Sequence, residues 1–150
     1  MQHLAAALPT LHGAAANLAK QTPKVYFFDT GLVQGDEGVR FENLVACHLL
    51  KHVHWQQDAQ GKEVDLHYIR TKDGAEVDFC LSHKAPAGDT LTHLIECKLS
   101  DGKPHAALKR FAEQWTDAEA VQVVRNLRHE QDFGRVQVKQ AATWLRALDA

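Results

Sequence analysis

Two runs of alternating apolar and polar residues, joined by a short loop, constrain the fold of this chain more than any other feature. The first run covers residues 76–81 and the second covers residues 94–98. Alternation with a period of two is typical of β-strands that bury one face. A segment with Gly, Pro and Asp at residues 85–89 predicts the loop between them. We therefore expect the chain to build its sheet around this stretch.

Three charged residues occupy fixed positions on the two expected strands. Successive side chains of a strand point to opposite faces, so Glu96 and Lys98 should share a face that Cys97 does not. Asp78 lies between two apolar residues, which should point away from it. If the strands pair, two carboxylates and an ammonium converge on a patch that suits a hard divalent cation such as Mg²⁺. The alternative is a solvated strand face with three charges.

This order of an aspartate, a loop and Glu-x-Lys resembles the metal site of the PD-(D/E)xK nuclease superfamily. Asp78 corresponds to the aspartate, Glu96 and Lys98 correspond to the (D/E)xK pair, and Val77 stands where the superfamily has a proline. The resemblance implies that Asp78 and Glu96 hold Mg²⁺ or Mn²⁺ together with the carbonyl of Cys97. It also implies that Lys98 positions the attacking water.

Four segments in order resemble an uncharacterised nuclease-like domain that follows the motor in many prokaryotic AAA+-type ATPases. They are "PKVYFFDTGL" at 23–32, "GVRFENLV" at 38–45, "EVDF" at 76–79 and "ECK" at 96–98. Ordered motifs are more specific than any one of them. The resemblance implies an AAA+ ATPase module as partner. It also matches Glu42 to a glutamate that leans over the metal from the first core helix. The alternative is an exposed glutamate near the positive end of that helix.

The sequence contains no Gly-x-x-x-x-Gly-Lys-[Ser/Thr] loop for nucleotide phosphates, so the ATPase itself is missing. We expect an excised domain or a shortened gene product, and the sequence leaves both open. Residues 1–23 are alanine-rich and interrupted by Pro9 and Gly13, which predicts an irregular leader. Residues 24–150 are predicted to form the nuclease-like domain.

Composition limits the classes of function. A chain of 150 residues forms one domain, and a net charge of −2 excludes coating nucleic acid through bulk charge. Three cysteines without a Cys-x-x-Cys pair fit reduced thiols in the cytoplasm. A faint zinc pattern is present in the spacing Cys80-x-x-His83 followed by His93-x-x-x-Cys97. On a strand, however, Cys80 and His83 would face opposite ways. No apolar run is long enough to span a membrane. The sequence leaves open whether the chain forms a homo-oligomer.

Periodicity and turn residues predict the order of elements. Asp36 should cap a helix over 36–54, and Asp73-Gly74 should turn one strand into the next. The expected elements after that helix are a loop at 55–63, strands at 65–70, 75–81 and 91–98, a helix from Pro104 to Trp115, strands at 120–124 and 136–138, and a helix at 141–148. Residues 36–126 thus predict an α/β fold with a mixed central sheet flanked by helices. This αβββαβ order is that of the restriction-endonuclease-like core.

The sequence therefore predicts a metal-dependent nuclease-like domain that hydrolyses phosphodiester bonds of a nucleic acid, with DNA as the expected substrate. Its predicted catalytic residues are Glu42, Asp78, Glu96 and Lys98. The alternative is a non-catalytic regulatory or interaction module of an AAA+ ATPase system, because a fold does not determine a function.

Overall fold

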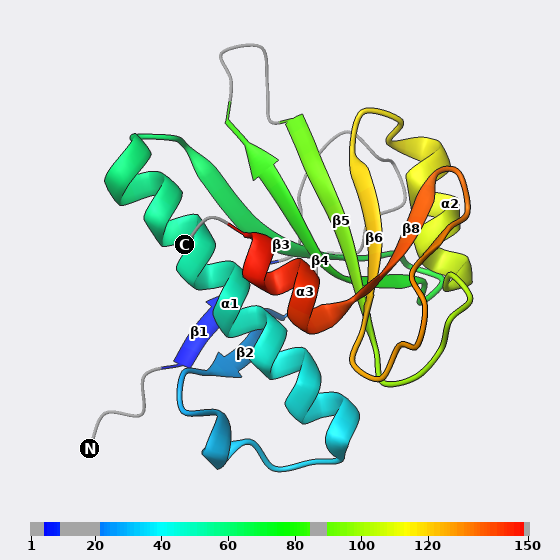
Figure 1. The fold of residues 1–150 in the computed structure, drawn as a ribbon. Helices are drawn as coiled ribbons and strands as arrows, with labels where there is room; N and C mark the ends of the chain where they lie inside the picture. The colour runs from blue at the N-terminus through cyan, green and yellow to red at the C-terminus, as the bar shows by residue number, and fades with distance from the viewer. Residues whose placement is uncertain (1–4, 10–21, 85–89, 149–150) are drawn as a thin grey trace.

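The computed structural model describes residues 5–9, 22–84 and 90–148, and the loop predicted at residues 85–89 lies outside this part of the chain. Helices and strands follow one another as shown in Figure 1. They are β1 (Ala5–Leu8), β2 (Lys24–Phe27), the 3₁₀ helix η1 (Thr30–Leu32), α1 (Glu37–Gln60), β3 (Val64–Arg70), β4 (Glu76–His83), β5 (Thr90–Lys98), α2 (Ala106–Gln114), β6 (Glu119–Val124), β7 (Gln131–Asp132), β8 (Val136–Gln140) and α3 (Ala141–Ala147).

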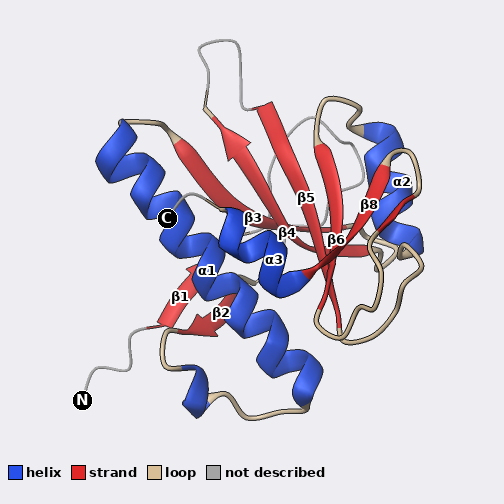
Figure 2. Cartoon of the chain, viewed as in Figure 1, coloured by secondary structure: helices blue, strands red, loops and turns tan. Residues whose placement is uncertain are grey.

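The described strands form a six-stranded sheet in the order β3-β4-β5-β6-β8-β7 and a separate pair, β1-β2. Neighbours β3, β4 and β5 run antiparallel, whereas β5, β6 and β8 run parallel. The connection from β5 to β6 passes through α2, as parallel neighbours require. Figure 2 shows helices in front of and behind the sheet. The predicted α/β class, with a mixed sheet flanked by helices, is confirmed.

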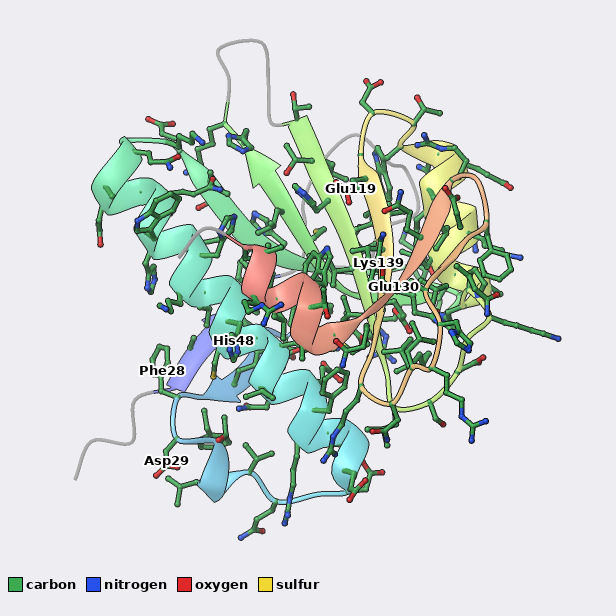
Figure 3. All side chains as sticks on the ribbon, in the orientation of Figure 1. Phe28, Asp29, His48, Glu119, Glu130 and Lys139 are labelled. Atoms are coloured by element: carbon green, nitrogen blue, oxygen red, sulfur yellow. The ribbon has the colours of Figure 1, made fainter. Side chains whose placement is uncertain are left out.

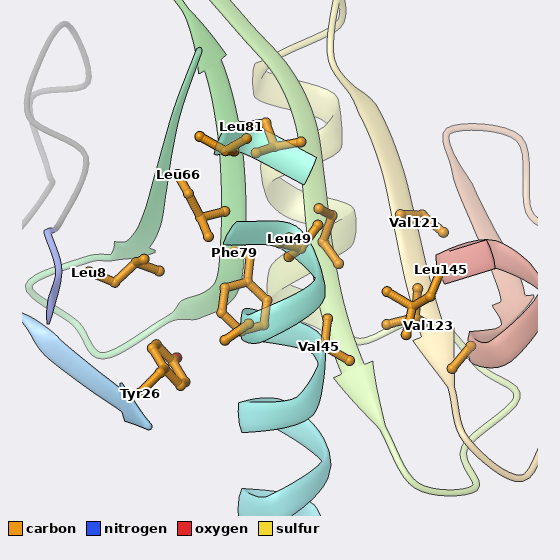
Figure 4. Packing of buried hydrophobic residues seen from close by; sticks show 14 of the residues in the cluster. Leu8, Tyr26, Val45, Leu49, Leu66, Phe79, Leu81, Val121, Val123 and Leu145 are labelled. Carbon is orange, nitrogen blue, oxygen red and sulfur yellow. The ribbon is translucent and has the colours of Figure 1, made fainter. Parts of the chain in front are cut away.

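The sheet carries a hydrophobic core on each face. Helices α1 and α3 cover one face, where Leu49 and Leu145 pack with Phe79 and Val123 (Figure 4). Helix α2 covers the other face, where Leu108 packs in a second cluster. Each core buries the apolar stripe of a helix against alternate residues of the strands, which is why the strands are apolar on both faces. Among the described residues no helix is both long and apolar enough to cross a membrane.

The three predicted strands at 65–70, 75–81 and 91–98 are confirmed as adjacent strands β3, β4 and β5. The Asp73-Gly74 turn joins the first two. Gly74 has φ of 88°, a left-handed conformation that glycine adopts without a steric cost. Its N–H donates to the carbonyl of Thr71 at 3.1 Å, and the Thr71 N–H donates to the carbonyl of Ala75 at 2.8 Å. These bonds fix the register of the hairpin.

Helix α1 begins as predicted and ends later than predicted. The Asp36 carboxylate accepts the Val39 N–H at 3.0 Å, so Asp36 is the N-cap. The loop predicted at residues 55–63 is wrong for residues 55–60, which continue the helix to Gln60. Gly61 then ends it in a left-handed conformation, with φ of 63°. Hydrophobic spacing fades after residue 54, but helix propensity and this glycine set the real boundary.

Two smaller predictions also need correction. The leader predicted to be irregular contains β1, which pairs with β2 so that Ala5 lies opposite Phe27 and Leu8 opposite Lys24. Leu8 is buried in the core under α1. Alanine has weak strand propensity, so this strand exists because of its tertiary partner. Helix α2 begins at Ala106, after an N-cap at His105, so Pro104 precedes the helix instead of opening it.

Candidate functional site

A pocket of about 400 Å³ lies where β4 and β5 separate. The first paired residues of these strands are Phe79 and Ile95, so the last residues of β5 extend past the β4 ladder. The pocket is lined by Gly38, Glu42, Asp78, Cys97, Lys98, Leu99, Ser100 and Asp101. Three of the four predicted catalytic residues are therefore on its wall, and the fourth, Glu96, is buried beside them, with its residue 3% exposed.

A β-bulge decides which way Asp78 points. His67 pairs with Cys80 and Ile69 pairs with Val77, so β4 has an extra residue between these two pairs. The expectation that Val77 and Phe79 share a face is therefore wrong. Val77 packs in the core under α2, and Phe79 packs in the core under α1. Bulges re-aim side chains in this way, and this one turns Asp78 towards the residues of α1 and β2.

The Asp78 carboxylate is buried and crowded by like charges. Its Oδ2 accepts the backbone N–H of Cys97 at 2.9 Å, which ties β4 to the end of β5. Burial, with the nearby carboxylates of Glu96 and Glu42, raises the pKa of Asp78 to about 8. The Lys24 ammonium, 3.9 Å from Oδ1, offsets only part of this effect. The fold thus holds Asp78 where its ionised form lacks full compensation.

Glu96 and Lys98 share a face, as predicted. Lys98 Nζ donates to Glu96 Oε1 at 2.7 Å, and His105 Nδ1 lies 3.4 Å from the same oxygen. Burial is the largest single influence and opposes the charge of Lys98, but the hydrogen bond to Glu96 and the charges of Glu96 and Asp78 together outweigh it and raise the pKa of the lysine. The other carboxylate oxygen, Glu96 Oε2, is buried and has no hydrogen-bond partner in the described part of the chain. Glu96 therefore uses one oxygen for Lys98 and leaves the second unsatisfied.

Glu42 lies in the first turns of α1 and is fixed by β2. Its Oε1 accepts hydrogen bonds from Tyr26 Oη at 2.6 Å and from Lys24 Nζ at 3.1 Å. Burial and the Glu42 charge both raise the pKa of the tyrosine hydroxyl, so it stays protonated as a donor. Lys24 and Tyr26 are two residues apart on a strand, which puts both on the same face. Glu42 thus borders the pocket, with two partners from a strand that precedes it.

Lys24 reaches further into the same group of acids. Its ammonium also pairs with Glu76, and Arg70 Nε lies 3.6 Å from the second oxygen of Glu76. Lys24, Tyr26 and Glu76 were not among the site residues predicted from the sequence. The signal was present in the "PKVYFFDTGL" segment, whose lysine and tyrosine recur at strand spacing.

Asn43 locks β2 onto α1. Its carboxamide accepts the Phe27 N–H and donates to the Phe27 carbonyl, both at 2.8 Å. The Cys47 thiol donates to the same carbonyl at 3.2 Å. Asn43 is buried, and it completes the edge of β2 as a neighbouring strand would. The "FEN" motif therefore supplies a site glutamate and, next to it, the residue that holds the glutamate's partners in place.

Gln122 fixes the loop after Lys98. It is fully buried in β6, where its amide donates to the carbonyls of Asp101 and Lys103 at 2.9 Å each. Its oxygen accepts the His105 N–H at 2.8 Å. Sequence reasoning treated residues 120–124 as a buried strand and did not use the glutamine. A polar residue inside an apolar run was the available signal, because buried polar groups are there to make hydrogen bonds.

The three cysteines do not form a cluster. Cys47, Cys80 and Cys97 are all described, and each is a free thiol. Cys80 packs in the core under α2, and Cys97 packs against the core under α1, so the faint zinc pattern is split between two faces of the sheet. Across the described residues, no three or more His, Cys, Asp or Glu side chains lie close enough to hold a metal ion. A hydrated Mg²⁺, however, often takes only one or two protein carboxylates.

The mixed sheet and its pocket define an α/β protein with a buried group of carboxylates and lysines at the fork of two strands. Residues 37–144, well over half of the chain, match the family described as Domain of unknown function (DUF4143), and the chain belongs to that family. No curated protein and no solved structure matched the chain. The matched region contains Glu42, Asp78, Glu96 and Lys98, whereas Lys24 precedes it.

Proposed function

We propose that this protein is a metal-dependent, PD-(D/E)xK nuclease-like domain that hydrolyses phosphodiester bonds, with DNA as substrate. The observation that carries the proposal is the unsatisfied Oε2 of Glu96 close to the crowded carboxylate of Asp78. A buried acceptor without a partner costs about 1–3 kcal/mol, and more when it is charged. A divalent cation between the two carboxylates would satisfy the acceptor and neutralise the repulsion. Lys98 alone does neither, because it contacts the other oxygen.

The donor set fits Mg²⁺ or Mn²⁺. Asp78 and Glu96 would hold the ion with the carbonyl of Cys97, and waters would complete the shell, as hard cations prefer. A cation held there supplies charge neutralisation at a phosphate and lowers the pKa of a bound water. The pocket wall is otherwise made of small residues and the loop after β5, which leaves room for a phosphate group.

The neighbouring side chains would orient the reactants. Lys98 borders the pocket and is held in place by Glu96, so its ammonium can direct a water towards a phosphorus atom. Glu42 borders the pocket from the side of α1 and can hold a further water through its carboxylate. Both side chains are fixed by hydrogen bonds that the pocket itself does not supply, which favours preorganisation.

Two further features support this proposal. The order α1, β3, β4, β5, α2, β6 is the αβββαβ order of the restriction-endonuclease-like core. The four sequence segments that resemble the domain attached to AAA+-type ATPases converge on the pocket or brace it. The proposal therefore includes an AAA+ ATPase module as partner and the cytoplasm as location.

The second candidate is a non-catalytic interaction module, and one observation favours it. Five of the six large apolar side chains that are exposed among the described residues lie between residues 25 and 44. They are Val25, Phe28, Leu32, Val39 and Leu44. Figure 3 shows Phe28 at the side of β2 and η1. Clustered exposed apolar residues often mark a protein contact. Val25, Leu32 and Val39 line a second pocket that shares Glu42 with the candidate site, so a contact surface there is compatible with either function.

Calorimetric titration of MgCl₂ and MnCl₂ tests the metal site. The wild type should bind one ion, and Asp78→Asn should bind at least about tenfold more weakly, because it removes one ligand charge at constant shape. Asp65→Asn is the matched control, since Asp65 lies on β3 in an ion pair with Lys84. Titrations with and without duplex DNA are needed, because phosphate can complete the shell. Equal binding by wild type and Asp78→Asn in both settings would refute the metal site.

A cleavage assay separates the two candidates. Wild type with Mn²⁺ should nick or degrade DNA, and Lys98→Ala should retain the metal but lose turnover, since it removes the group that orients water. Single-stranded DNA, duplex DNA and RNA should be compared, with Asp65→Asn as the active control. Metal binding without cleavage of any of them would favour the interaction module.

A further inference from the structure

Lys24 is a cation already built into the acidic group. Its ammonium contacts Glu42 and Glu76 and lies 3.9 Å from Asp78, so three carboxylates surround one amine. The side chain is three-quarters buried. Burial opposes its charge most strongly, yet Glu42, Glu76 and Asp78 together raise the pKa of Lys24 above its usual value. The lysine therefore remains charged inside the group.

The strand that carries Lys24 is held firmly in place. Asn43 clamps the backbone of Phe27, β1 pairs along the strand, and Tyr26 reaches Glu42 beside the lysine. The ammonium of Lys24 also lies over the ring of Tyr68, with Nζ 5.3 Å from the ring centroid. The strand fixes the backbone of the lysine, so only side-chain freedom is lost when the ammonium forms these contacts.

The positive charge of Lys24 should lower the affinity of the pocket for a divalent cation. Asp78 is both a proposed metal ligand and the acid nearest to Lys24 after Glu42 and Glu76. A positive charge about 4 Å from a ligand oxygen repels an incoming dication and satisfies part of the negative charge that attracts it. Lys98 is bonded to Glu96 and forms no ion pair with Asp78 among the described residues, so Lys24 is the lysine that pairs with Asp78.

We propose that Lys24 is a positioning residue that fixes Glu42 and sets the affinity of the pocket for a divalent cation by competing with it for carboxylate charge. The inference rests on the proposed metal site and deepens it. It assigns the "PK" part of the first sequence segment to the pocket, and it makes the pocket depend on β2 as well as on the β4–β5 fork. It predicts a metal site that is weak in the wild type and tightens when Lys24 is replaced by an uncharged residue.

The test is calorimetric titration of MnCl₂ into the full chain and its variants. Lys24→Met keeps most of the length of the side chain and removes the charge, so it should bind Mn²⁺ about tenfold more tightly than wild type. Lys24→Arg keeps the charge and should bind like wild type. Lys139→Met controls for overall charge, because Lys139 pairs with Glu130 at 3.4 Å on β8, separated from β5 by β6 (Figure 3). It should leave the affinity unchanged.

The direction of the change distinguishes this role from a structural one. A lysine that only braced Glu42 would, when removed, loosen the pocket and weaken Mn²⁺ binding. Equal or weaker binding by Lys24→Met, with binding by wild type intact, would overturn the inference and leave the proposed function standing. Absence of Mn²⁺ binding in wild type and Lys24→Met, with or without DNA, would instead overturn the proposed metal site and the inference with it.

A second variant covers the case in which Lys24→Met does not fold. Glu76→Gln removes a partner that draws Lys24 away from Asp78, so Lys24 should compete more strongly and Mn²⁺ binding should weaken several-fold. Unchanged or tighter binding by a folded Glu76→Gln would overturn the inference. Far-UV circular dichroism establishes folding for each variant before titration.

Discussion

Asp78 and Glu96 are both buried carboxylates, yet their surroundings differ. Glu96 has Lys98 in direct contact through one oxygen. Asp78 has the backbone N–H of Cys97 and a lysine at a distance, with two further carboxylates nearby. The negative charge of the carboxylate is therefore partly compensated at Glu96, whereas at Asp78 neighbouring carboxylates oppose it. Asp78 is the residue at which the fold and the charge conflict most directly.

This conflict predicts that Asp78→Asn stabilises the metal-free protein in a pH-dependent way. The folded-state pKa of Asp78, about 8, is higher than in an unfolded chain. The stability that this difference contributes is complete below about pH 4 and is lost as pH rises through 8. The variant escapes the loss, so its free energy of unfolding should exceed that of wild type by about 1–3 kcal/mol at pH 8. The gain should vanish near pH 4.

Urea unfolding between pH 4 and pH 9, with a chelator present, measures this difference. Asp65→Asn is the control, because its carboxylate is in an ion pair with Lys84 and no gain at high pH is expected. A stability difference between wild type and Asp78→Asn that stays the same across the pH range would contradict the electrostatic origin.

At the scale of elements, the attachment of β2 to α1 depends on one side chain. Asn43→Ala would leave the N–H and the carbonyl of Phe27 without their partner, apart from the weak thiol donor of Cys47. Losing two hydrogen bonds at a buried site should lower the free energy of unfolding by roughly 2–3 kcal/mol. Urea unfolding checks this value. Asn126→Ala, at an exposed loop position, is the control and should change stability by less than about 0.5 kcal/mol.

The end of α1 depends on a glycine. Gly61 has φ of 63° at the C-cap, and a side chain there is strained even though a Cβ would meet nothing within 4 Å. Gly61→Ala should therefore cost about 1 kcal/mol of stability. Gly102→Ala is the matched control, because its Cβ would make only ordinary contacts at 3.8 and 3.9 Å. Equal unfolding free energies of the two variants would show that backbone conformation is not the cause.

These elements show which parts of the fold the sequence predicts. Strands β3 to β5 and the start of α1 follow from local signals, namely alternation, the Asp73-Gly74 turn and the Asp36 cap. The extension of α1 to Gln60 was missed because its last turns lack an apolar stripe. Strand β1 was missed because alanine gives no strand signal and its partner β2 is distant in sequence.

The candidate site divides in the same way. Contacts within a strand were predictable, so the pairing of Glu96 with Lys98 followed from a spacing of two. The direction of Asp78 was not, because a bulge between two strands reversed the expected alternation. The contacts of Lys24 with Glu42 and Glu76 bridge three separate elements. No local pattern encodes such long-range geometry, although the sequence motifs did mark the segments that contain these residues.

At the scale of the whole molecule, one sheet is shared by two cores. Leu49 of α1 lies in one core and Leu108 of α2 in the other, and both are fully buried. Every strand from β4 to β6 contributes residues to both cores. Losing one core would therefore expose a face of the strands that hold the other. The pocket lies in the fork of this sheet, so its geometry depends on both.

This architecture predicts that the chain unfolds as one cooperative unit. Leu49→Ala and Leu108→Ala should each lower the free energy of unfolding by about 2–5 kcal/mol, as for buried leucines in general. Because the sites lie on opposite faces of the sheet without a shared contact, the double variant should lose the sum of the two within about 0.5 kcal/mol. Leu44→Ala, at a position that is 39% exposed, should cost much less.

Urea unfolding followed by tryptophan fluorescence and by far-UV circular dichroism checks both parts of this prediction. Trp144 packs against the core under α1, and Trp115 packs against the core under α2, so fluorescence reports on both faces. The two signals should give coincident transitions in wild type and in each variant. Separate transitions in Leu108→Ala, with the α1 face persisting after the α2 face has opened, would mean that the sheet does not couple the cores. The pocket would then be expected to survive the loss of α2, and metal binding by Leu108→Ala in the intermediate would reveal it.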